Sequence, residues 1–328
     1  MDFIDIDAKY IEMEKIRTAA DIIKDGGIVA FPTETVYGLG ADAFNPLAVA
    51  RIFEVKKRPS FDPLIVHISD PSDIEILSSD VDERTRRLVE AFWPGPLTVV
   101  VKKLEVVPDI VTAGLPTVAI RMPAHAVALE LIREAETPLA APSANPFGYI
   151  SPSTPEHVKE QIGSDVDLII DGGRCMIGVE STVIDLTRKD PILLRPGGLP
   201  LEEIEDVIGP VKTSRVDPDR PNSPGQLLRH YSPRTQIKII GEEGFEAIPG
   251  KRTGLLAFTP QEEMRSFEVV EVLSKNGDFR EAASNLFFCL HRLDKAGLDV
   301  IYVEPVPEVG LGRAIMDRLN RAAGIRRE

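Results

Sequence analysis

Short apolar segments that each end in a polar residue close to a proline recur through the N-terminal part of the chain. Phe31 is followed by Pro-Thr, Ile120 by Arg-Met-Pro, Ala141 by Pro-Ser-Ala-Asn and Leu194 by Arg-Pro-Gly. Because proline cannot donate a hydrogen bond to a β-ladder, each segment is expected to be a strand that stops near its proline. The pattern therefore predicts a sheet whose strand ends carry polar side chains.

Helical periodicity alternates with these strands, which predicts an α/β fold. The expected helices are residues 11–25, 46–56, 85–92 and 124–135, and the expected strands are residues 28–31, 63–69, 97–102, 117–122, 139–141, 168–170, 181–186 and 192–195. Thr117 and Ser181 stand at strand beginnings, whereas Arg121 and Arg195 stand at strand ends. If these residues share one edge, some strands must run antiparallel, so we expect a mixed, twisted sheet.

Residues 209–236 break this pattern, because they are rich in Pro, Ser, Arg and Asp. Five Lys or Arg and two Asp between residues 212 and 234 give a local charge of +3 in a chain of net charge −14. Beyond this stretch, strands at 237–240, 254–258, 267–272 and 300–303 and helices at 279–296 and 311–323 are expected, in the alternation of a small Rossmann-like domain. We therefore expect a catalytic domain at 1–209, a linker or lid at 210–236 and a second domain at 237–328.

Composition and charge argue against several classes of protein. The acidic net charge of −14 argues against a general nucleic-acid binder. Cys175 and Cys289 lie far apart and match no metal-binding spacing, so both are expected to be buried, reduced thiols. The acidic N-terminus does not have the form of a signal peptide, and no apolar run has the length of a membrane span, which predicts a cytoplasmic protein.

The polar residues near the strand ends are hydroxyls, an amide and guanidiniums. The sequence shows no nucleophile with an adjacent base and no paired catalytic carboxylates, so anion binding and charge stabilisation are the indicated chemistry. Structural roles remain open for several of these residues. Lys56 and Arg58 can form a solvated helix end, His67 can be a structural histidine, and the arginines can form surface salt bridges.

Seven segments carry a family resemblance in both order and spacing: GGIVAFPTETVYGLGADA, KKRPSFDPLIVHI, FWPGPLTVV, TVAIRMP, PLAAPSAN, GVESTVIDL and LLRPG. From about Ile11 to Gly209 the chain resembles a YrdC-type domain, and SPGQLLRHYSP with the tail resembles the linker and second domain of the long form. The chain is thus similar to the long, two-domain threonylcarbamoyl-adenylate synthases of the YrdC-type family.

The resemblance implies a nucleotidyltransferase that converts L-threonine, bicarbonate and ATP, with Mg²⁺, into threonylcarbamoyl-AMP and pyrophosphate. A tRNA threonylcarbamoyl transferase would take the product to make threonylcarbamoyladenosine (t6A), while the acidic charge argues against more than weak tRNA binding by this chain. The implied threonine-binding residues are Thr35, His67, Arg121, Ala141 and Ser181. The implied ATP-binding residues are Lys56, Arg58, Asp62, Thr117, Ser143, Asn145, Ser151, Arg195 and Tyr231, and Lys56, Arg58 and Arg195 are the implied catalytic residues.

Asp62 departs from the family pattern, in which asparagine is expected; an acid there would weaken a nucleotide contact or favour Mg²⁺. The loop at residues 32–40 is expected to wall the threonine pocket, with glycines that permit close backbone approach. Two other functions fit the sequence less well. An RNA-binding module is disfavoured by the net charge, and a carbamoyl-adenylate unit of hydrogenase maturation lacks its usual acylphosphatase-like and zinc-finger companions here.

Overall fold

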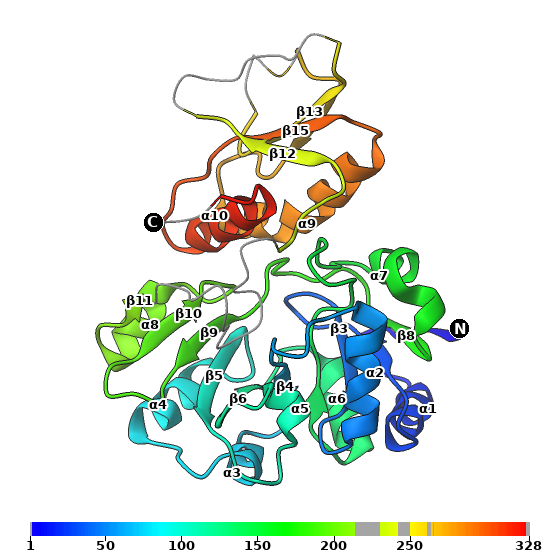
Figure 1. Cartoon of the computed structure of the whole chain (residues 1–328), viewed down its shortest axis with the longest axis vertical. Coiled ribbons are helices and arrows are strands. Elements are labelled where there is room, and N and C mark those ends of the chain that lie inside the picture. Colours follow the sequence, from blue (N-terminus) through cyan, green and yellow to red (C-terminus); the bar gives the residue numbers. More distant parts are fainter. Residues whose placement is uncertain (1, 214–229, 242–249, 261–263, 265, 326–328) are drawn as a thin grey trace.

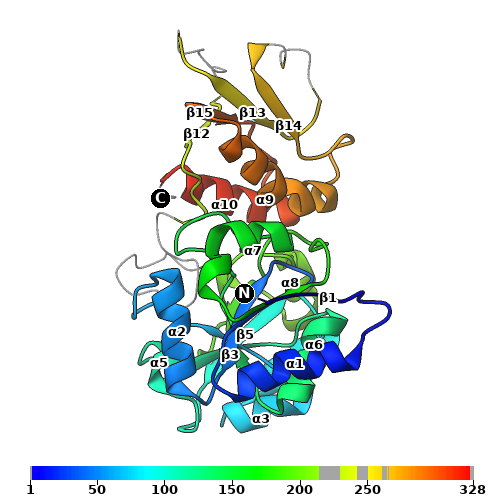
Figure 2. The same cartoon turned by 90° about the vertical axis from the view of Figure 1, so that its right-hand side faces the viewer.

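The computed structural model describes residues 2–213, 230–241, 250–260, 264 and 266–325, which form two sheets (Figures 1 and 2). The strands of the larger sheet are β1 (Asp2–Asp5), β2 (Val29–Phe31), β3 (Gly38–Asp42), β4 (Ile65–His67), β5 (Leu97–Lys102), β6 (Thr117–Arg121), β7 (Leu139–Ala140), β8 (Leu168–Asp171), β9 (Thr182–Asp185), β10 (Ile192–Arg195) and β11 (Lys212–Thr213). The helices around it are α1 (Met13–Lys24), α2 (Pro46–Lys56), α3 (Ile74–Leu77), α4 (Glu83–Phe92), α5 (Asp109–Thr112), α6 (Ala126–Ala135), α7 (Pro155–Ile162) and α8 (Leu201–Ile208), with short 3₁₀ turns at Pro71–Asp73 and Gly163–Asp165.

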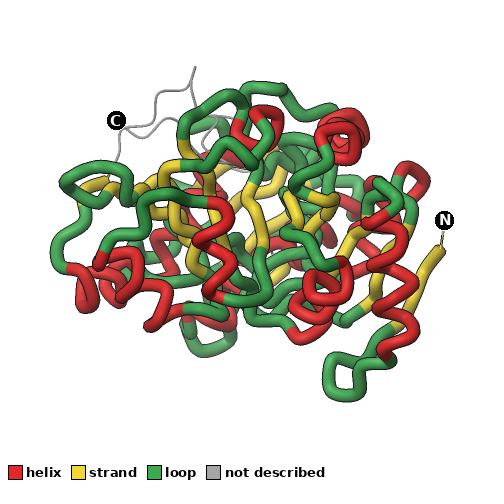
Figure 3. The backbone as a smooth tube through the Cα atoms, turned by 90° about the horizontal axis from the view of Figure 1, so that it is seen from below, coloured by secondary structure: helices red, strands yellow, loops and turns green. Residues whose placement is uncertain are grey.

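The larger sheet has the strand order β1-β8-β2-β3-β7-β4-β6-β5-β9-β10-β11. Parallel pairs such as β4–β6 and β5–β9 alternate with antiparallel pairs such as β5–β6 and β9–β10, which confirms the predicted mixed sheet. Seen from below, the strands run through the middle of this domain with helices along its flanks (Figure 3).

Local sequence signals explain several element boundaries. Asn45 caps α2 by accepting hydrogen bonds from the amides of Leu47 and Ala48, and Pro46 occupies the first helical turn, as the sequence predicts. The prediction of a loop through residue 40 is wrong, because Gly38 to Asp42 form β3 and turn back on β2 as a hairpin. A Cβ at Gly40 would lie 2.7 Å from the ring of Phe31, so packing inside this hairpin requires the glycine.

The smaller sheet consists of β12 (Gln236–Ile239), β13 (Thr253–Ala257), β14 (Val269–Val272) and β15 (Val300–Val303), and its helices are α9 (Phe279–Lys295) and α10 (Leu311–Ala322). All its strand pairs are parallel, in the order β12-β15-β13-β14, as expected for a small Rossmann-like domain. Both helices lie between this sheet and the larger domain (Figure 1).

The two domains share an apolar cluster. Val36, Ile150 and Val179 of the larger domain belong to the same cluster as Leu286 and Phe287 of α9, and all five side chains are buried. The loop before β9 approaches α9 very closely, because a Cβ at Gly178 would lie 2.5 Å from the carbonyl oxygen of Ala283. Backbone atoms of the first domain therefore lie directly against the backbone of α9 in the second domain.

Part of the predicted linker, residues 214–229, lies outside the described residues, and residues 230–236 lead into β12. Among the described residues, no helix is both long and apolar enough to cross a membrane. Cys175 and Cys289 are free and buried, as predicted.

Candidate functional site

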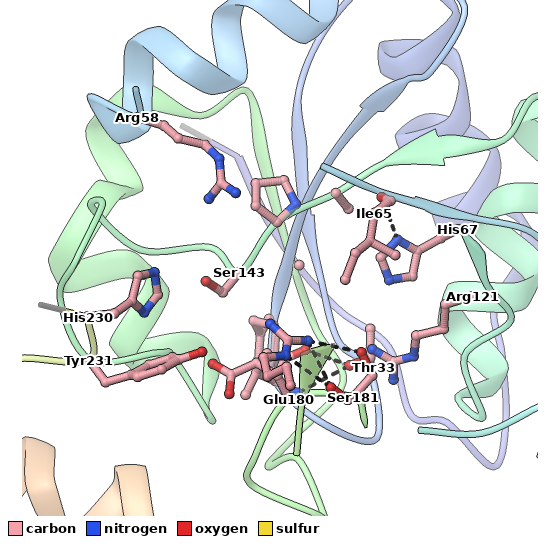
Figure 4. A pocket seen from close by; sticks show the side chains of 16 residues that line it. Thr33, Arg58, Ile65, His67, Arg121, Ser143, Glu180, Ser181, His230 and Tyr231 are labelled. Carbon is pink, nitrogen blue, oxygen red and sulfur yellow. Dashed lines mark hydrogen bonds between the residues drawn. The ribbon is translucent and has the colours of Figure 1, made fainter. Parts of the chain in front are cut away.

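A cavity of about 50 Å³ lies in the larger domain, and His230 and Tyr231 of the linker form part of its wall (Figure 4). Tyr231 reaches the wall with a φ of 63°, a backbone conformation that is strained for a residue other than glycine. The linker therefore contributes directly to the wall of the cavity.

Strand directions explain how distant residues meet at this cavity. Arg121 ends β6 and Arg195 ends β10, whereas Ser181 directly precedes β9. Because β9 is parallel to β5 and antiparallel to β10, and β5 is antiparallel to β6, these three residues share one edge of the sheet. Thr117 begins β6 and so lies at the opposite end of that strand from Arg121.

One side of the cavity combines an uncharged imidazole with a guanidinium. Nδ1 of His67 lies 3.2 Å from the carbonyl oxygen of Ile65, so the ring donates there and leaves Nε2 as an acceptor. Burial, followed by the charge of Arg121, lowers the pKa of His67 to about 3, so the ring is neutral at physiological pH. A neutral acceptor beside a fixed cation suits a ligand that carries both a carboxylate and a hydroxyl donor.

Arg121 is held from behind by two groups of the protein. Its Nε donates to the carbonyl oxygen of Gly95 at 3.3 Å, and its Nη2 lies 2.7 Å from Oε1 of Glu34. The side chain points from the end of β6 toward Thr33 and Ser181 (Figure 4). Arg121 is buried, which excludes the alternative of a surface salt bridge and agrees with its prediction as a site residue.

The other side of the cavity contains a second cation, Arg58. Its Nε and Nη2 donate to the carbonyl oxygens of Asp62 and Pro63 at 3.0 and 2.8 Å, and Nη2 also pairs with the Asp62 carboxylate at 2.9 Å. Burial raises the pKa of Asp62, and the charges of Arg58 and Lys56 counter part of that rise. The carboxylate at position 62 therefore acts as an internal counter-ion for Arg58.

Lys56 supports this region without lining the cavity. Its Nζ lies 2.5 Å from both the Ser143 and the Asn145 carbonyl oxygens, which fixes the loop after β7. Burial, then the nearby Arg58, lowers the pKa of Lys56 well below its usual range. Lys56 and Arg58 are both buried, so neither belongs to a solvated helix end.

Arg195 and Ser181 form the floor between the two sides. Arg195 donates from Nη2 to the carbonyl oxygen of Ser181 at 2.9 Å and to its hydroxyl at 3.1 Å. The same hydroxyl lies 2.7 Å from that of Thr98 on β5. Arg195 thus fixes the start of β9 while its own side chain remains part of the cavity wall.

A side chain of the second domain contacts the cavity wall. Arg318 of α10 is fully buried and lies 2.8 Å from Oε2 of Glu180, which lines the cavity. It also donates to the carbonyl oxygen of Pro196 at 2.9 Å, and its guanidinium lies 5.0 Å from the Tyr231 ring centroid. Burial acts to raise the pKa of Glu180, but Arg318 and Arg195 outweigh it and keep the carboxyl ionised.

The structure sorts the residues predicted from sequence into two groups. Those on the cavity wall are Arg58, His67, Arg121, Ala141, Ser143, Ser181, Arg195 and Tyr231. Those away from the wall are Thr35, Lys56, Asp62, Thr117, Asn145 and Ser151. Thr35 and Ser151 each contact a wall residue, because their hydroxyls lie 2.9 Å from the Thr33 hydroxyl and 2.5 Å from Oε1 of Glu180.

Sequence reasoning missed Glu180 and His230 as wall residues. Glu180 directly precedes the predicted Ser181, so its position in the chain was the available signal. Buried polar atoms near the cavity make no hydrogen bond with any described residue: His230 Nδ1, the Tyr231 hydroxyl and Asn145 Oδ1. Buried polar groups normally have partners, so these atoms are suited to a polar ligand.

Two family models cover the chain. The model Sua5_yciO_yrdC, described as telomere recombination, matches residues 21–197, and the model described as threonylcarbamoyl-AMP synthase, C-terminal domain, matches residues 199–324.

Several known proteins are similar over nearly the whole chain. A threonylcarbamoyl-AMP synthase of Pyrococcus abyssi is 48% identical and one of Bacillus subtilis is 42% identical; the first match covers 96% of both chains, and the second covers 98% of this chain and 97% of the relative. The crystal structure of P. abyssi Sua5 complexed with L-threonine superposes with a TM-score of 0.92 at 44% identity, over 99% of this chain and 98% of that one.

Proposed function

The chain belongs to the Sua5–YciO–YrdC family in its two-domain form, and from this premise we propose that it synthesises threonylcarbamoyl-AMP from L-threonine, bicarbonate and ATP. The observation that carries the proposal is a cavity whose wall carries three guanidiniums, with Arg121 on one side, Arg58 on the other and Arg195 as a third. The proposed reaction brings together an amino-acid carboxylate and a triphosphate, and guanidiniums match both kinds of anion.

The threonine side would use Arg121 for the α-carboxylate. The hydroxyls of Thr33 and Ser181 and the neutral His67 supply polar partners, while Ala141 supplies an apolar surface for the methyl group. The nucleotide would use Arg58, Arg195, Ser143 and the linker residue Tyr231.

The proposed chemistry has two steps. The threonine amine attacks the carbon of bicarbonate and, with loss of water, gives a carbamate; a carbamate oxygen then attacks the α-phosphorus of ATP and displaces pyrophosphate. The protein aligns the reactants and stabilises the negative charge that develops on the phosphates. The described residues contain no group of three His, Cys, Asp or Glu side chains that fits a metal ion, so we propose that Mg²⁺ enters as part of the MgATP substrate.

Mass spectrometry of the products from ATP, bicarbonate and single amino acids tests this function. Threonine is expected to give threonylcarbamoyl-AMP and pyrophosphate, and serine, which lacks the methyl group, at least about tenfold less product at limiting concentration. Valine lacks the hydroxyl and is expected to be rejected more strongly, because the site's polar groups would be left unpaired. Equal turnover of valine and threonine contradicts the proposed pocket, and absence of any adenylate contradicts the function.

The product is proposed to serve a tRNA threonylcarbamoyl transferase that makes t6A, in a cytoplasmic setting. Threonylcarbamoyl-AMP is a mixed anhydride of a carbamate and a phosphate, so an acceptor nitrogen on another molecule can displace AMP. The acidic net charge of −14 supports hand-over of this intermediate rather than stable tRNA binding by the chain itself. Adding the transferase and tRNA to the reaction mixture and measuring modified nucleoside tests this step.

A further inference from the structure

Glu34 forms a buried ion pair directly behind the cavity. The exposed fractions of Glu34 and Arg121 are 6% and 4%, and Oε1 of Glu34 lies 2.7 Å from Nη2 of Arg121. Among the described residues, no other carboxylate lies within ion-pair distance of Arg121. A buried charge needs a partner, so this pair stabilises the guanidinium before any substrate binds.

The pair also fixes how the guanidinium is oriented. Nε of Arg121 donates to the Gly95 carbonyl oxygen and Nη2 pairs with Glu34, so the protein holds one edge of the planar group. Among the described residues, Nη2 and the Glu34 oxygens make no hydrogen bond, so their contact is an ion pair alone. Arg121 also lines the cavity, where its guanidinium is accessible to a ligand.

Glu34 itself is shielded from the cavity. Its two carboxylate oxygens are buried and the residue is not part of the cavity wall. Its backbone is anchored, because its carbonyl oxygen accepts from the amide of Ile177 at 2.8 Å. The neighbouring Thr35 carbonyl oxygen accepts from the amide of Gly178 at 3.1 Å. The carboxylate therefore stands on a fixed piece of chain and acts on substrate only through Arg121.

We propose that Glu34 is a positioning residue that presents Arg121 to the α-carboxylate of the amino-acid substrate and thereby sets the affinity for that substrate. The inference rests on the proposed function, since it assigns the ligand of Arg121 as an amino acid. The proposed role of Glu34 is to orient Arg121, for which an oxygen of the side chain must reach Nη2. A substituted side chain that keeps an oxygen beside Nη2 is therefore expected to preserve the orientation of Arg121.

Three variants at one position separate orientation from charge. Glu34→Ala removes the acceptor, Glu34→Asp keeps the charge but shortens its reach, and Glu34→Gln keeps an oxygen at the same distance without the charge. The measurements are the dissociation constant of radiolabelled L-threonine, without ATP or bicarbonate, and the Michaelis constants for threonine and ATP. Glu271→Ala is the matched control, because Glu271 is also buried and ion-paired but lies in the second domain, with Arg292 3.0 Å away.

The Ala and Asp variants are expected to raise the threonine dissociation constant and KM about tenfold or more, while the KM for ATP stays within about twofold. The Gln variant and the Glu271 control are expected to stay within about threefold of wild type for threonine. Circular dichroism checks that each variant is folded, and the Asp variant replaces the Ala variant if the latter does not fold.

Unchanged threonine binding in both the Ala and the Asp variant overturns the proposal, and so does a Gln variant as impaired as Ala. Equal losses in Glu34→Ala and Glu271→Ala overturn it as well, because they indicate a general loss of stability. Wild-type protein that binds threonine but forms no adenylate contradicts the proposed function alone, and the binding comparison among the variants still decides the role of Glu34.

Discussion

At the scale of single residues, three buried ion pairs each join a residue of the cavity wall to a partner that lies behind the wall. Arg121 pairs with Glu34, Arg58 with Asp62 and Arg318 with Glu180. The sequence predicted the arginines of the first domain, because they stand at strand or helix ends. It could not predict their partners, since Glu34 reaches Arg121 only through the hairpin between β2 and β3, and Arg318 comes from the other domain.

A pair of histidines joins the two domains in a pH-sensitive way. The rings of His157 on α7 and His291 on α9 are stacked, with centroids 3.8 Å apart. Burial, with smaller contributions from His291, Lys295 and Arg174, lowers the pKa of His157 to about 3, and burial lowers that of His291 to about 4. Both rings are therefore neutral in the folded protein at physiological pH.

Below their unfolded pKa of 6.5 the histidines destabilise the fold, because the unfolded chain takes up protons that the folded chain does not. The free energy of unfolding is expected to fall as the pH drops from 6.5 toward 4, by at most about 2 kcal/mol per ring at pH 5. Urea unfolding at pH 7.5 and pH 5.0 measures this change. His157→Phe keeps a stacked ring and should show a smaller loss; an unchanged loss contradicts the assignment.

At the scale of elements, the segment before β9 connects α9 to the cavity wall. Gly178 has a φ of 75° and touches the backbone of α9, while Glu180 and Ser181, two and three residues later, line the cavity. Nearby Gly173 has a similar φ of 79°, but a Cβ there would meet nothing within 4 Å. Substitutions at these two glycines therefore distinguish the cost of backbone strain from the cost of a clash with α9.

Gly178→Ala is expected to destabilise the protein more than Gly173→Ala. Both variants place a side chain at positive φ, which costs about 1–2 kcal/mol, and only Gly178→Ala adds a clash with α9, worth about 1–3 kcal/mol more. Urea unfolding measures the difference, and the KM for ATP reports whether Glu180 and Ser181 have shifted. Equal effects of the two substitutions would show that α9 does not rest on this loop.

The elements that the sequence predicted best are those with strong local signals. Residues 97–102 and 192–195 form strands with the expected bounds, and α2 ends where expected. β1 and β3 were missed because their pairing is set by distant strands: β1 pairs with β8, and β3 pairs with both β2 and β7. A strand of glycine and small residues such as β3 lacks the β-branched pattern that identifies strands locally.

At the scale of the whole molecule, Arg318 connects the second domain to the cavity. Arg318→Met in the full chain would leave Glu180 buried without its charged partner, which is expected to cost about 3–5 kcal/mol of folding free energy and to impair ATP use. The matched control on the same helix is Arg313→Met, whose pair with Glu202 is 3.0 Å long with side-chain exposures of 26% and 50%. That loss is expected to be about 0–1 kcal/mol.

Thermal and urea unfolding, with the KM for ATP, compare the two variants. Similar small losses would show that Ser151 and Arg195 are sufficient to stabilise Glu180, and that Arg318 does not shape the cavity. The sequence predicted a second domain of this class but not this contact, because an arginine in an amphipathic helix carries no local sign of what it will pair with.

The apolar cluster shared by the two domains also bears on how this chain can evolve. Val36 and Val179 of the first domain are buried in one cluster with Leu286 and Phe287 of α9. Exchange of the second domain for another of the same fold, through recombination, would expose these side chains and leave Glu180 without Arg318. Substitutions in α9 or α10 are therefore expected to depend on the sequence of the first domain.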